Sequence, residues 1–379
     1  MRIRYLIWTV VLTLGMGCGK NAPIDPEINE VTEPRFPSLP EEQFAYSGLS
    51  FPESWLNDPA LALFGGFASD IEVTDAGATL GRVLFYDPQL SLDNSVSCAS
   101  CHQQEHAFSD PHVRSAGVSG ALTQRNAMAL FNLNYQRRLF WDLRTIGLEN
   151  QVLEPIEHPD EMAMNLEALP EKLAQLDYYP DLFQRAFGDE TISAERIASA
   201  LAQFIRCFHS YSSRFDRGLE NDFTEFTAQE MLGKDIFFNG QTRCNQCHSG
   251  KNLFSTQPFI NGLELDYAEA GDGGIGALTG DPFDDGRFKT VSLRNIGLTA
   301  PYMHDGRFNS LREVVDFYSD DIQPHPYLDE RLSVNGFGSP GQAPYQLNLS
   351  EEEREALVEF LHTFDDTVMV AAEWLSDPF

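Results

Sequence analysis

Cys98-Ala99-Ser100-Cys101-His102 and its second copy, Cys244-Asn245-Gln246-Cys247-His248, decide the fold of this chain. In each CxxCH motif, two thiols can add to the vinyl groups of one haem while the histidine offers a neutral imidazole to the iron. A four-cysteine zinc site would keep its CxxC pairs roughly 15–20 residues apart, whereas residues 102–243 lie between these pairs. A thioredoxin-like motif would need one CxxC beside a βαβ pattern, and neither copy has that setting. The sequence therefore predicts two covalent c-type haems.

The first residues resemble an export signal. Two arginines precede the apolar run 5–16, which is too short to span a bilayer and ends in Gly17-Cys18. We therefore expect a signal peptide over 1–17 and lipidation of Cys18, although Gly15 stands where lipoproteins usually carry leucine. The alternative is a soluble exported protein that is cleaved nearby. In either case we expect a periplasmic protein, and if Cys18 is lipidated, the lipid anchor is its only membrane contact.

The formal net charge is −31. Such an acidic surface argues against nucleic acid and anionic lipid as partners and favours encounter with a basic protein, although it can also serve solubility alone. Of the cysteines, only Cys207 lies outside the two motifs and the predicted lipid site. It lies in a helical stripe with Leu201, Phe204 and Phe208, which predicts a buried, inert thiol.

Helical periodicity dominates the rest of the chain. The segment 80–85 leads into the first motif as the similar segment 232–237 leads into the second, which indicates an internal duplication. Further helices are expected over 194–216 after the cap Ser193, over 227–238, over 311–318, and from Ser350, which forms a capping box with Glu353. Few stretches alternate as strands would, so the predicted fold class is all-α. The Gly- and Asp-rich segment 271–286 is expected to be a solvated loop.

Several motifs occur in an order that resembles one family. They are Leu80 to His102, Arg125-Asn126, Phe140-Trp141-Asp142, Leu148-Glu149-Asn150-Gln151, Glu161-Met162 and Lys289 to Gly306. Together they resemble the bacterial di-haem cytochrome c peroxidase and MauG family over roughly residues 50–370. The resemblance implies two cytochrome-c-like domains with one haem each. The expected division is a signal peptide (1–17), a lipid-anchored flexible linker (18–48), a peroxidatic haem domain (49–220) and an electron-transfer haem domain (221–379).

A haem that reduces peroxide needs one open axial position, whereas one that only passes electrons does better with both positions filled. The resemblance makes His102 the proximal ligand of the first haem. Many family members place a second histidine in the loop that here spans 116–120 and contains none, while His106 and His112 are poor substitutes. We therefore expect an open first iron.

The resemblance also implies that Glu161 carries the peroxide proton and that Gln151 and Pro155 shape the distal pocket. Glu161 lies in an acidic run with Glu154, Glu157 and Asp160, so any one of these carboxylates is equally compatible with a solvated turn. The residues alone do not select Glu161.

For the second haem, His248 is the proximal residue, and the resemblance places Tyr318 on the far side, with Met303 as the fallback. Tyr318 also continues the stripe Leu311, Val314 and Val315, so a core role competes with ligation. A thioether would favour ferrous iron, whereas a phenolate favours higher oxidation states. Tyr318 therefore indicates MauG-like storage of oxidising equivalents.

Two further assignments follow from the resemblance alone. Trp141 would relay charge between the haems, although most tryptophans of this kind are simply core side chains. Asn126, Thr299 and Pro301 would offer oxygen atoms to a calcium ion between the domains. His304 is expected near haem propionates or the calcium shell, and His158 is interpreted as structural or exposed.

The favoured function is reduction of hydrogen peroxide with electrons from a small cytochrome or copper protein. One alternative is MauG-like oxidation of a residue on a partner protein. Another is a non-catalytic di-haem electron carrier. A homodimer is compatible with all three.

Overall fold

The computed structural model describes residues 35–57, 72–334 and 343–379. The expected signal peptide and Cys18 lie outside these residues. Within the described ranges, no helix is both long enough and apolar enough to cross a membrane. The domain limits expected from the sequence stay a prediction.

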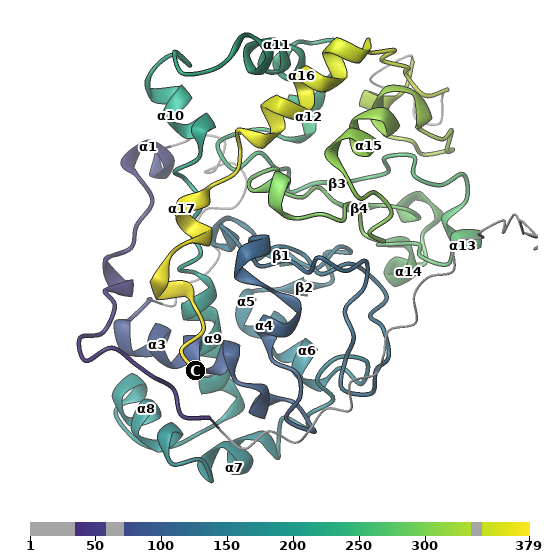
Figure 1. The fold of residues 1–379 in the computed structure, drawn as a ribbon. Helices are drawn as coiled ribbons and strands as arrows, with labels where there is room; N and C mark the ends of the chain where they lie inside the picture. Colours follow the sequence, from purple (N-terminus) through teal and green to yellow (C-terminus); the bar gives the residue numbers. More distant parts are fainter. Residues whose placement is uncertain (1–34, 58–71, 335–342) are drawn as a thin grey trace, which may run out of the picture. The chain divides into compact units, whose positions relative to one another are not determined.

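Short helices with irregular connections make up most of the chain (Figure 1). The helices in its first part are α1 Glu53–Leu56, α3 Asp75–Tyr86, α4 Cys98–Cys101, α5 Leu148–Gln151, α6 Leu153–Glu157, α7 Leu169–Ala174, α8 Tyr178–Phe187 and α9 Ala194–Ile205. Those in the second part are α10 Arg214–Glu220, α11 Ala228–Phe238, α12 Cys244–Cys247, α13 Tyr267–Ala270, α14 Gly276–Thr279, α15 Leu311–Asp316, α16 Glu351–His362 and α17 Thr367–Val370.

The strands form two small antiparallel pairs. Strand β1 (Arg138–Leu139) pairs with β2 (Thr145–Ile146), and β3 (Pro258–Phe259) pairs with β4 (Phe288–Lys289). The predicted helical class is confirmed, and these short strand pairs are additions that the sequence did not indicate.

The internal duplication reappears in how the helices pack. Helix α3 packs on α9, and α11 packs on α16. A methyl group on Gly81 of α3 would overlap the carbonyl oxygen of Ala200 in α9, and one on Gly233 of α11 would overlap that of Ala356 in α16. Each glycine thus allows its helix to approach its neighbour closely, and each of these helices precedes one CxxC turn.

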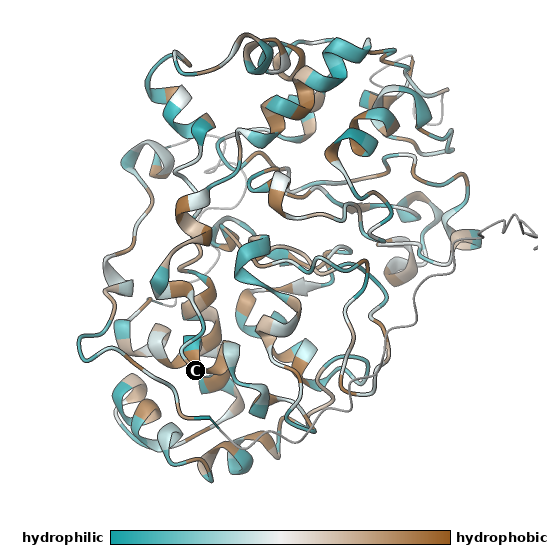
Figure 2. Cartoon of the chain, viewed as in Figure 1, coloured by the Kyte–Doolittle hydropathy of each residue, from teal (hydrophilic) through white to brown (hydrophobic). Residues whose placement is uncertain are grey.

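Two large apolar clusters contain these helix pairs. The first core includes Leu201, Phe204 and Phe208, which are fully buried, and it covers Cys207. The second core is centred on Phe360 and Phe364. Figure 2 shows brown apolar residues beside teal polar ones on the same helices, as amphipathic helices require. The prediction that Cys207 is buried is confirmed, and burial raises its pKa to about 12, which disfavours the reactive thiolate.

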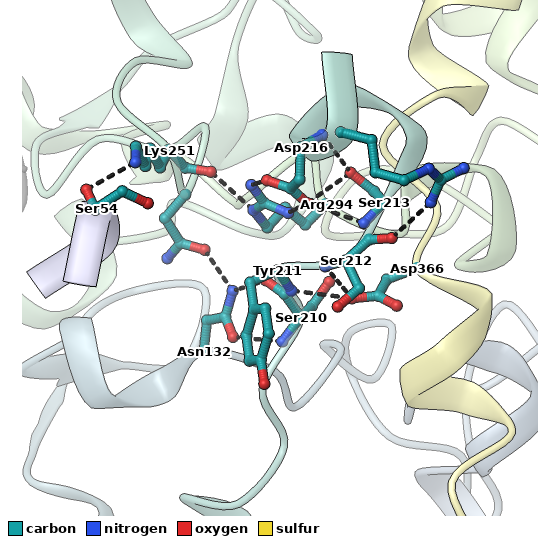
Figure 3. A network of polar contacts seen from close by, with 12 residues as sticks. Ser54, Asn132, Ser210, Tyr211, Ser212, Ser213, Asp216, Lys251, Arg294 and Asp366 are labelled. Carbon is teal, nitrogen blue, oxygen red and sulfur yellow. Dashed lines mark hydrogen bonds and ion pairs between the residues drawn. The ribbon is translucent and has the colours of Figure 1, made fainter. Parts of the chain in front are cut away.

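The prediction of one helix over 194–216 is wrong. Helix α9 ends at Ile205 and α10 begins at Arg214, because the intervening backbone bonds to side chains far away in the sequence. Asn132 Oδ1 accepts from the Ser210 amide at 2.8 Å, and Asp366 Oδ2 accepts from the amides of Tyr211 and Ser212 at 2.9 and 2.8 Å (Figure 3). Ser213 then caps α10.

The same network holds the second part of the chain in place. Arg294 is fully buried and donates to both oxygens of Asp216, at 2.7 and 2.6 Å (Figure 3). Its guanidinium also lies 4.4 Å from the centroid of the Trp55 ring. A buried charge pair of this kind is costly to break, since either partner alone would be left uncompensated.

Both ends of the described chain pack on the first core. The Tyr46 hydroxyl donates to the Trp374 carbonyl at 2.6 Å, and the Tyr86 hydroxyl donates to the Leu375 carbonyl at 2.6 Å. The flexible linker was expected to extend through residue 48. In its described part, 35–48, most side chains are exposed, but Tyr46 is buried and the Ser38 amide donates to the Pro378 carbonyl.

Candidate functional site

The first CxxC forms the short helix α4, with His102 as its C-terminal cap. His102 Nδ1 lies 2.9 Å from the carbonyl oxygen of Phe108, which can only accept, so Nδ1 carries the proton and Nε2 keeps its lone pair. Burial lowers the pKa of His102, which keeps the ring neutral. A neutral imidazole with its other nitrogen anchored in this way is the usual form of a metal-ligating histidine.

The second CxxC repeats this arrangement in α12. His248 Nδ1 lies 3.2 Å from the carbonyl oxygens of both Leu253 and Val291, and burial lowers its pKa to about 4. All the cysteines within the described ranges are free of disulfides. Each motif therefore presents two thiols and one free imidazole nitrogen on a single turn, as a c-type haem requires.

A cavity of about 490 Å³ opens beside Cys101 and His102. It brings together the residues that the resemblance assigned to the peroxide site and to calcium, since its lining includes Gln151, Pro155, Glu161, Trp141, Asn126, Thr299 and Pro301. A volume of this size is typical of small-molecule and cofactor pockets.

The contacts of the acidic run distinguish its four carboxylates. Glu154 accepts hydrogen bonds from Thr145 and from Arg144, so its charge is already balanced. Glu157 is exposed, and Asp160 does not line the cavity. Glu161 lines it, and within the described residues no arginine or lysine forms an ion pair with this carboxylate. Burial raises the pKa of Glu161, an effect that His158 partly offsets.

The loop 116–120 contacts the backbone of the turn that carries Glu161. The Val118 amide donates to the Glu161 carbonyl at 2.8 Å, and Gly117 lies so close to Asp160 that a side chain there would overlap its carbonyl. His106 and His112 do not line the cavity, and His112 is exposed and bonded to Asp110 at 2.8 Å. The loop that could have supplied a second histidine instead positions the acidic turn.

His158 lies closer to the site than the sequence suggested. Its side chain lines the cavity, and its Nδ1 lies 3.8 Å from Glu161 Oε1 while accepting from the Asp160 amide at 3.2 Å. The interpretation of His158 as only structural or exposed therefore misses its position beside Glu161 in the cavity. The i, i+3 spacing from Glu161 was the available signal.

A second cavity, of about 220 Å³, lies beside Cys244, Cys247 and His248, and both Tyr318 and Met303 line it. The Asn261 amide nitrogen lies 3.3 Å from the Tyr318 hydroxyl and 3.9 Å from the Met303 sulfur. Both predicted ligands therefore remain candidates. Asn261 was not predicted, and no sequence signal marked it.

Tyr318 does not continue α15 as the stripe had indicated. The α-helix ends at Asp316, and Phe317–Asp321 forms a π-helical turn. Such turns occur frequently at functional sites because the extra residue re-aims the side chains. Burial raises the pKa of Tyr318 to about 12, and the hydrogen bond from Asn261 offsets this in part.

Trp141 lines both cavities. Its Nε1 donates to the Asn126 carbonyl at 2.9 Å, and its own carbonyl accepts from the Lys289 amide at 2.8 Å. The ring is thus held between the two CxxCH sites by backbone partners on either side. This placement is what a charge relay requires, and a core packing role alone would not require contact with two cavities.

The side-chain amide of Asn126 donates to the His112 carbonyl at 3.0 Å, which leaves its oxygen for a cation. No group of three or more His, Cys, Asp or Glu side chains that could hold a metal occurs in the described part of the chain. A calcium site made of amide and carbonyl oxygens would not contain such a group of side chains. The assignment of Asn126, Thr299 and Pro301 to calcium therefore stays a prediction.

The segment 271–286 is not simply a solvated loop. Arg125 donates Nε and Nη2 to Asp272 at 2.7 Å each, and Nη1 to Asp142 at 2.6 Å. The sequence could not reveal this fork because its partners lie far apart in the chain. Close by, His304 stacks on Phe288 with ring centroids 3.8 Å apart.

Comparison with known proteins gives a consistent result. Residues 75–224 match the family model described as di-haem cytochrome c peroxidase. The chain is 34% identical to methylamine utilization protein MauG of Methylorubrum extorquens, over 77% of this chain and 78% of that protein. It is 33% identical to cytochrome c551 peroxidase of Nitrosomonas europaea, over 63% of this chain and 71% of that protein.

A solved structure shows the same architecture. The crystal structure of a MauG-like protein associated with microbial copper homeostasis superposes with a TM-score of 0.72 at 33% identity, covering 82% of this chain and 95% of that one. The diheme peroxidase BthA of Burkholderia thailandensis, at 24% identity and a TM-score of 0.64, shares the fold.

Proposed function

Because this chain belongs to the di-haem cytochrome c peroxidase and MauG family, we propose that it reduces hydrogen peroxide to water with electrons from a small periplasmic cytochrome c or copper protein. The observation that carries the proposal is Glu161, a half-buried carboxylate that lines the cavity beside His102 without a cationic lysine or arginine partner among the described residues. A general acid and base for peroxide needs this kind of placement.

The two CxxCH turns fit two c-type haems. Cys98, Cys101 and His102 would hold the first, and Cys244, Cys247 and His248 would hold the second, with Tyr318 or Met303 opposite His248. When bound, the haems would supply iron centres that bind peroxide and exchange electrons. The overall reaction takes one hydrogen peroxide, two electrons and two protons to two waters.

Side chains of this protein would transfer the protons of the reaction. Glu161 would accept the proton from the near oxygen of peroxide and return it to the far oxygen, so that the bond between the oxygens breaks with water as the leaving group. Its raised pKa makes the carboxylate a stronger base than a free glutamate, so it would accept the first proton more readily. Gln151 and Pro155 would limit the space above His102, and Trp141 would carry charge between the two sites.

A second candidate is MauG-like oxidation of a residue on a partner protein. Tyr318 favours it, because a phenolate at the second site would stabilise oxidised rather than ferrous iron. The relative named MauG is as similar to this chain as the peroxidase. A non-catalytic electron carrier is the third candidate, and Glu161, which lines the cavity without an arginine or lysine partner among the described residues, argues against it.

We also propose a calcium ion held by Asn126, Thr299 and Pro301, a lipid anchor at Cys18 and a periplasmic location. A homodimer is compatible with this assignment. These assignments are supported by the resemblance and by the leader sequence. Calcium removal by a chelator, followed by recording the haem spectrum, would test the first of them.

Steady-state kinetics would test the main proposal. Hydrogen peroxide is added to the holoprotein with a reduced small cytochrome c or a reduced copper protein, and donor oxidation is followed by absorbance. We expect rapid turnover with at least one donor. Slow turnover with every donor, together with a persistent oxidised species of the protein, would support MauG-like chemistry. If the protein does not react with peroxide at all, the proposed peroxidase activity is wrong and the non-catalytic electron carrier is the remaining candidate.

A further inference from the structure

Lys289 is a buried cation that the proposed reaction does not use. It lies in β4, is 8% exposed, and lines both the cavity beside His102 and the cavity beside His248. Its backbone amide is bonded to the Trp141 carbonyl, so the residue lies next to the aromatic ring between the two sites. Its place on the strand is therefore fixed.

The ammonium group has no partner within the described residues. No hydrogen bond or ion pair of Lys289 Nζ occurs there, and burial alone lowers its pKa, to about 7. Leaving a charged amine in this state costs several kcal/mol, and such groups usually pair or coordinate a ligand. Lys289 therefore needs a partner that the described residues do not supply.

Most of the acidic side chains near the cavities are already paired with arginines. Asp142 pairs with Arg125 and Arg144, and Asp329 pairs with Arg331. Across the first cavity, Glu154 is bonded to Arg144. Glu161 also lines the first cavity, but it forms no ion pair with Lys289. Within the described residues no carboxylate balances Lys289, so a group that fills the cavities can supply the negative charge.

We propose that Lys289 binds a carboxylate of a haem, a propionate, at the junction of the two cavities. The inference rests on the haems of the proposed function and is independent of which reaction they serve. A haem carries two carboxylates, and the lysine can neutralise one of them at hydrogen-bond distance. A cation fixed beside a haem favours the reduced iron, so Lys289 would raise the reduction potential of the haem that it touches.

The test uses the holoprotein with both haems and three substitutions of Lys289. Lys289→Met removes the charge and the hydrogen bond, Lys289→Gln keeps a hydrogen-bond donor, and Lys289→Arg keeps the charge. Lys234→Met is the matched control, since Lys234 lies on α11 and does not line either cavity. Haem content is measured from the pyridine haemochrome, and the midpoint potential of each haem is measured by spectroelectrochemical titration.

We expect Lys289→Met and Lys289→Gln to lower the midpoint potential of one haem, with Lys289→Arg and Lys234→Met near the wild-type values. The spectrum that shifts identifies the haem. Unchanged potentials of both haems in the two neutral variants would overturn the proposal. If the neutral variants lose a haem, retention of both haems by Lys289→Arg supports charge pairing, and equal loss in all three Lys289 variants refutes it.

Discussion

The environment of each carboxylate decides which member of the acidic run can move a proton. Glu154 is paired with Arg144, whereas the ion-pair partner of Glu161 among the described residues is His158, at 3.8 Å. The sequence places both residues in the same polar turn, and only the fold separates the structural carboxylate from the reactive one. The same logic applies to Lys289, which a sequence pattern cannot distinguish from a surface lysine.

Replacing Glu161 tests this distinction. We expect Glu161→Gln to lower kcat for peroxide by about 10²-fold or more, because general acid–base catalysis contributes 10²–10⁴-fold. Glu157→Gln is the control, as this neighbouring side chain is exposed. Haem content is measured alongside. Equal activity of the two variants would remove Glu161 from the mechanism.

The pH dependence follows from the raised pKa of Glu161. Burial favours the neutral acid, so the carboxyl group stays protonated up to a higher pH than a free glutamate does. If the carboxylate takes the first proton from peroxide, kcat/KM falls as the pH drops through this raised pKa. We expect the acid limb to lie above the usual glutamate range and to disappear in Glu161→Gln. An acid limb that persists in that variant would assign it to another group.

At the scale of elements, two glycine contacts set the distance between paired helices. Gly81 faces Ala200 and Phe204, and Gly233 faces Ala356 and Phe360, so the two halves use the same crossing. The CxxC turns follow these helices directly, and their positions depend on the crossing.

We expect Gly81→Ala and Gly233→Ala each to destabilise the protein by about 1–3 kcal/mol, the usual cost of overpacking. Gly240→Ala is the control, because nothing lies within 4 Å of a methyl group there, and its effect should stay within about 0.5 kcal/mol. Urea unfolding followed by circular dichroism measures both. If the Gly81 variant unfolds at the same urea concentration as the Gly240 variant, the close contact between the helices does not contribute to the free energy of unfolding.

Local signals in the sequence predicted where several of the helices begin. The caps Ser193, Thr227 and Ser350 begin α9, α11 and α16 as expected, because capping depends on neighbours within three residues. The break after Ile205 could not be predicted, since the side chains that hold it, Asn132 and Asp366, are distant in sequence.

The candidate site divides in the same way. The CxxCH motifs alone predict haem attachment and a histidine ligand. Glu161, Trp141 and Tyr318 were predicted from the resemblance to the family. The roles of Asn261 and Lys289 depend on which surfaces the fold brings to one cavity, so no local pattern marks them, whereas His158 had only its spacing from Glu161 as a signal. The π-helical turn at Tyr318 likewise follows from tertiary packing and not from residue spacing.

At the scale of the whole molecule, the net charge of −31 governs encounter with other proteins. Opposite charges speed association at low salt, and the effect fades once the Debye length falls to about 10 Å near 0.1 M. We expect kcat/KM with a basic cytochrome c to fall steeply between about 0.01 and 0.2 M NaCl. An acidic donor serves as the control and should show a flat or rising profile. A salt-independent rate with the basic donor would contradict electrostatic steering.

We propose that the two haem sites are unequal: the site beside His102 and Glu161 would bind peroxide, whereas His248 and Tyr318 would both hold the second haem. The most direct measurement is the electron paramagnetic resonance spectrum of the resting ferric holoprotein, recorded with Tyr318→Phe as the companion variant. We predict one high-spin and one low-spin haem, and loss of the low-spin signal in Tyr318→Phe. Two low-spin haems, both still six-coordinate after one-electron reduction, would contradict this account.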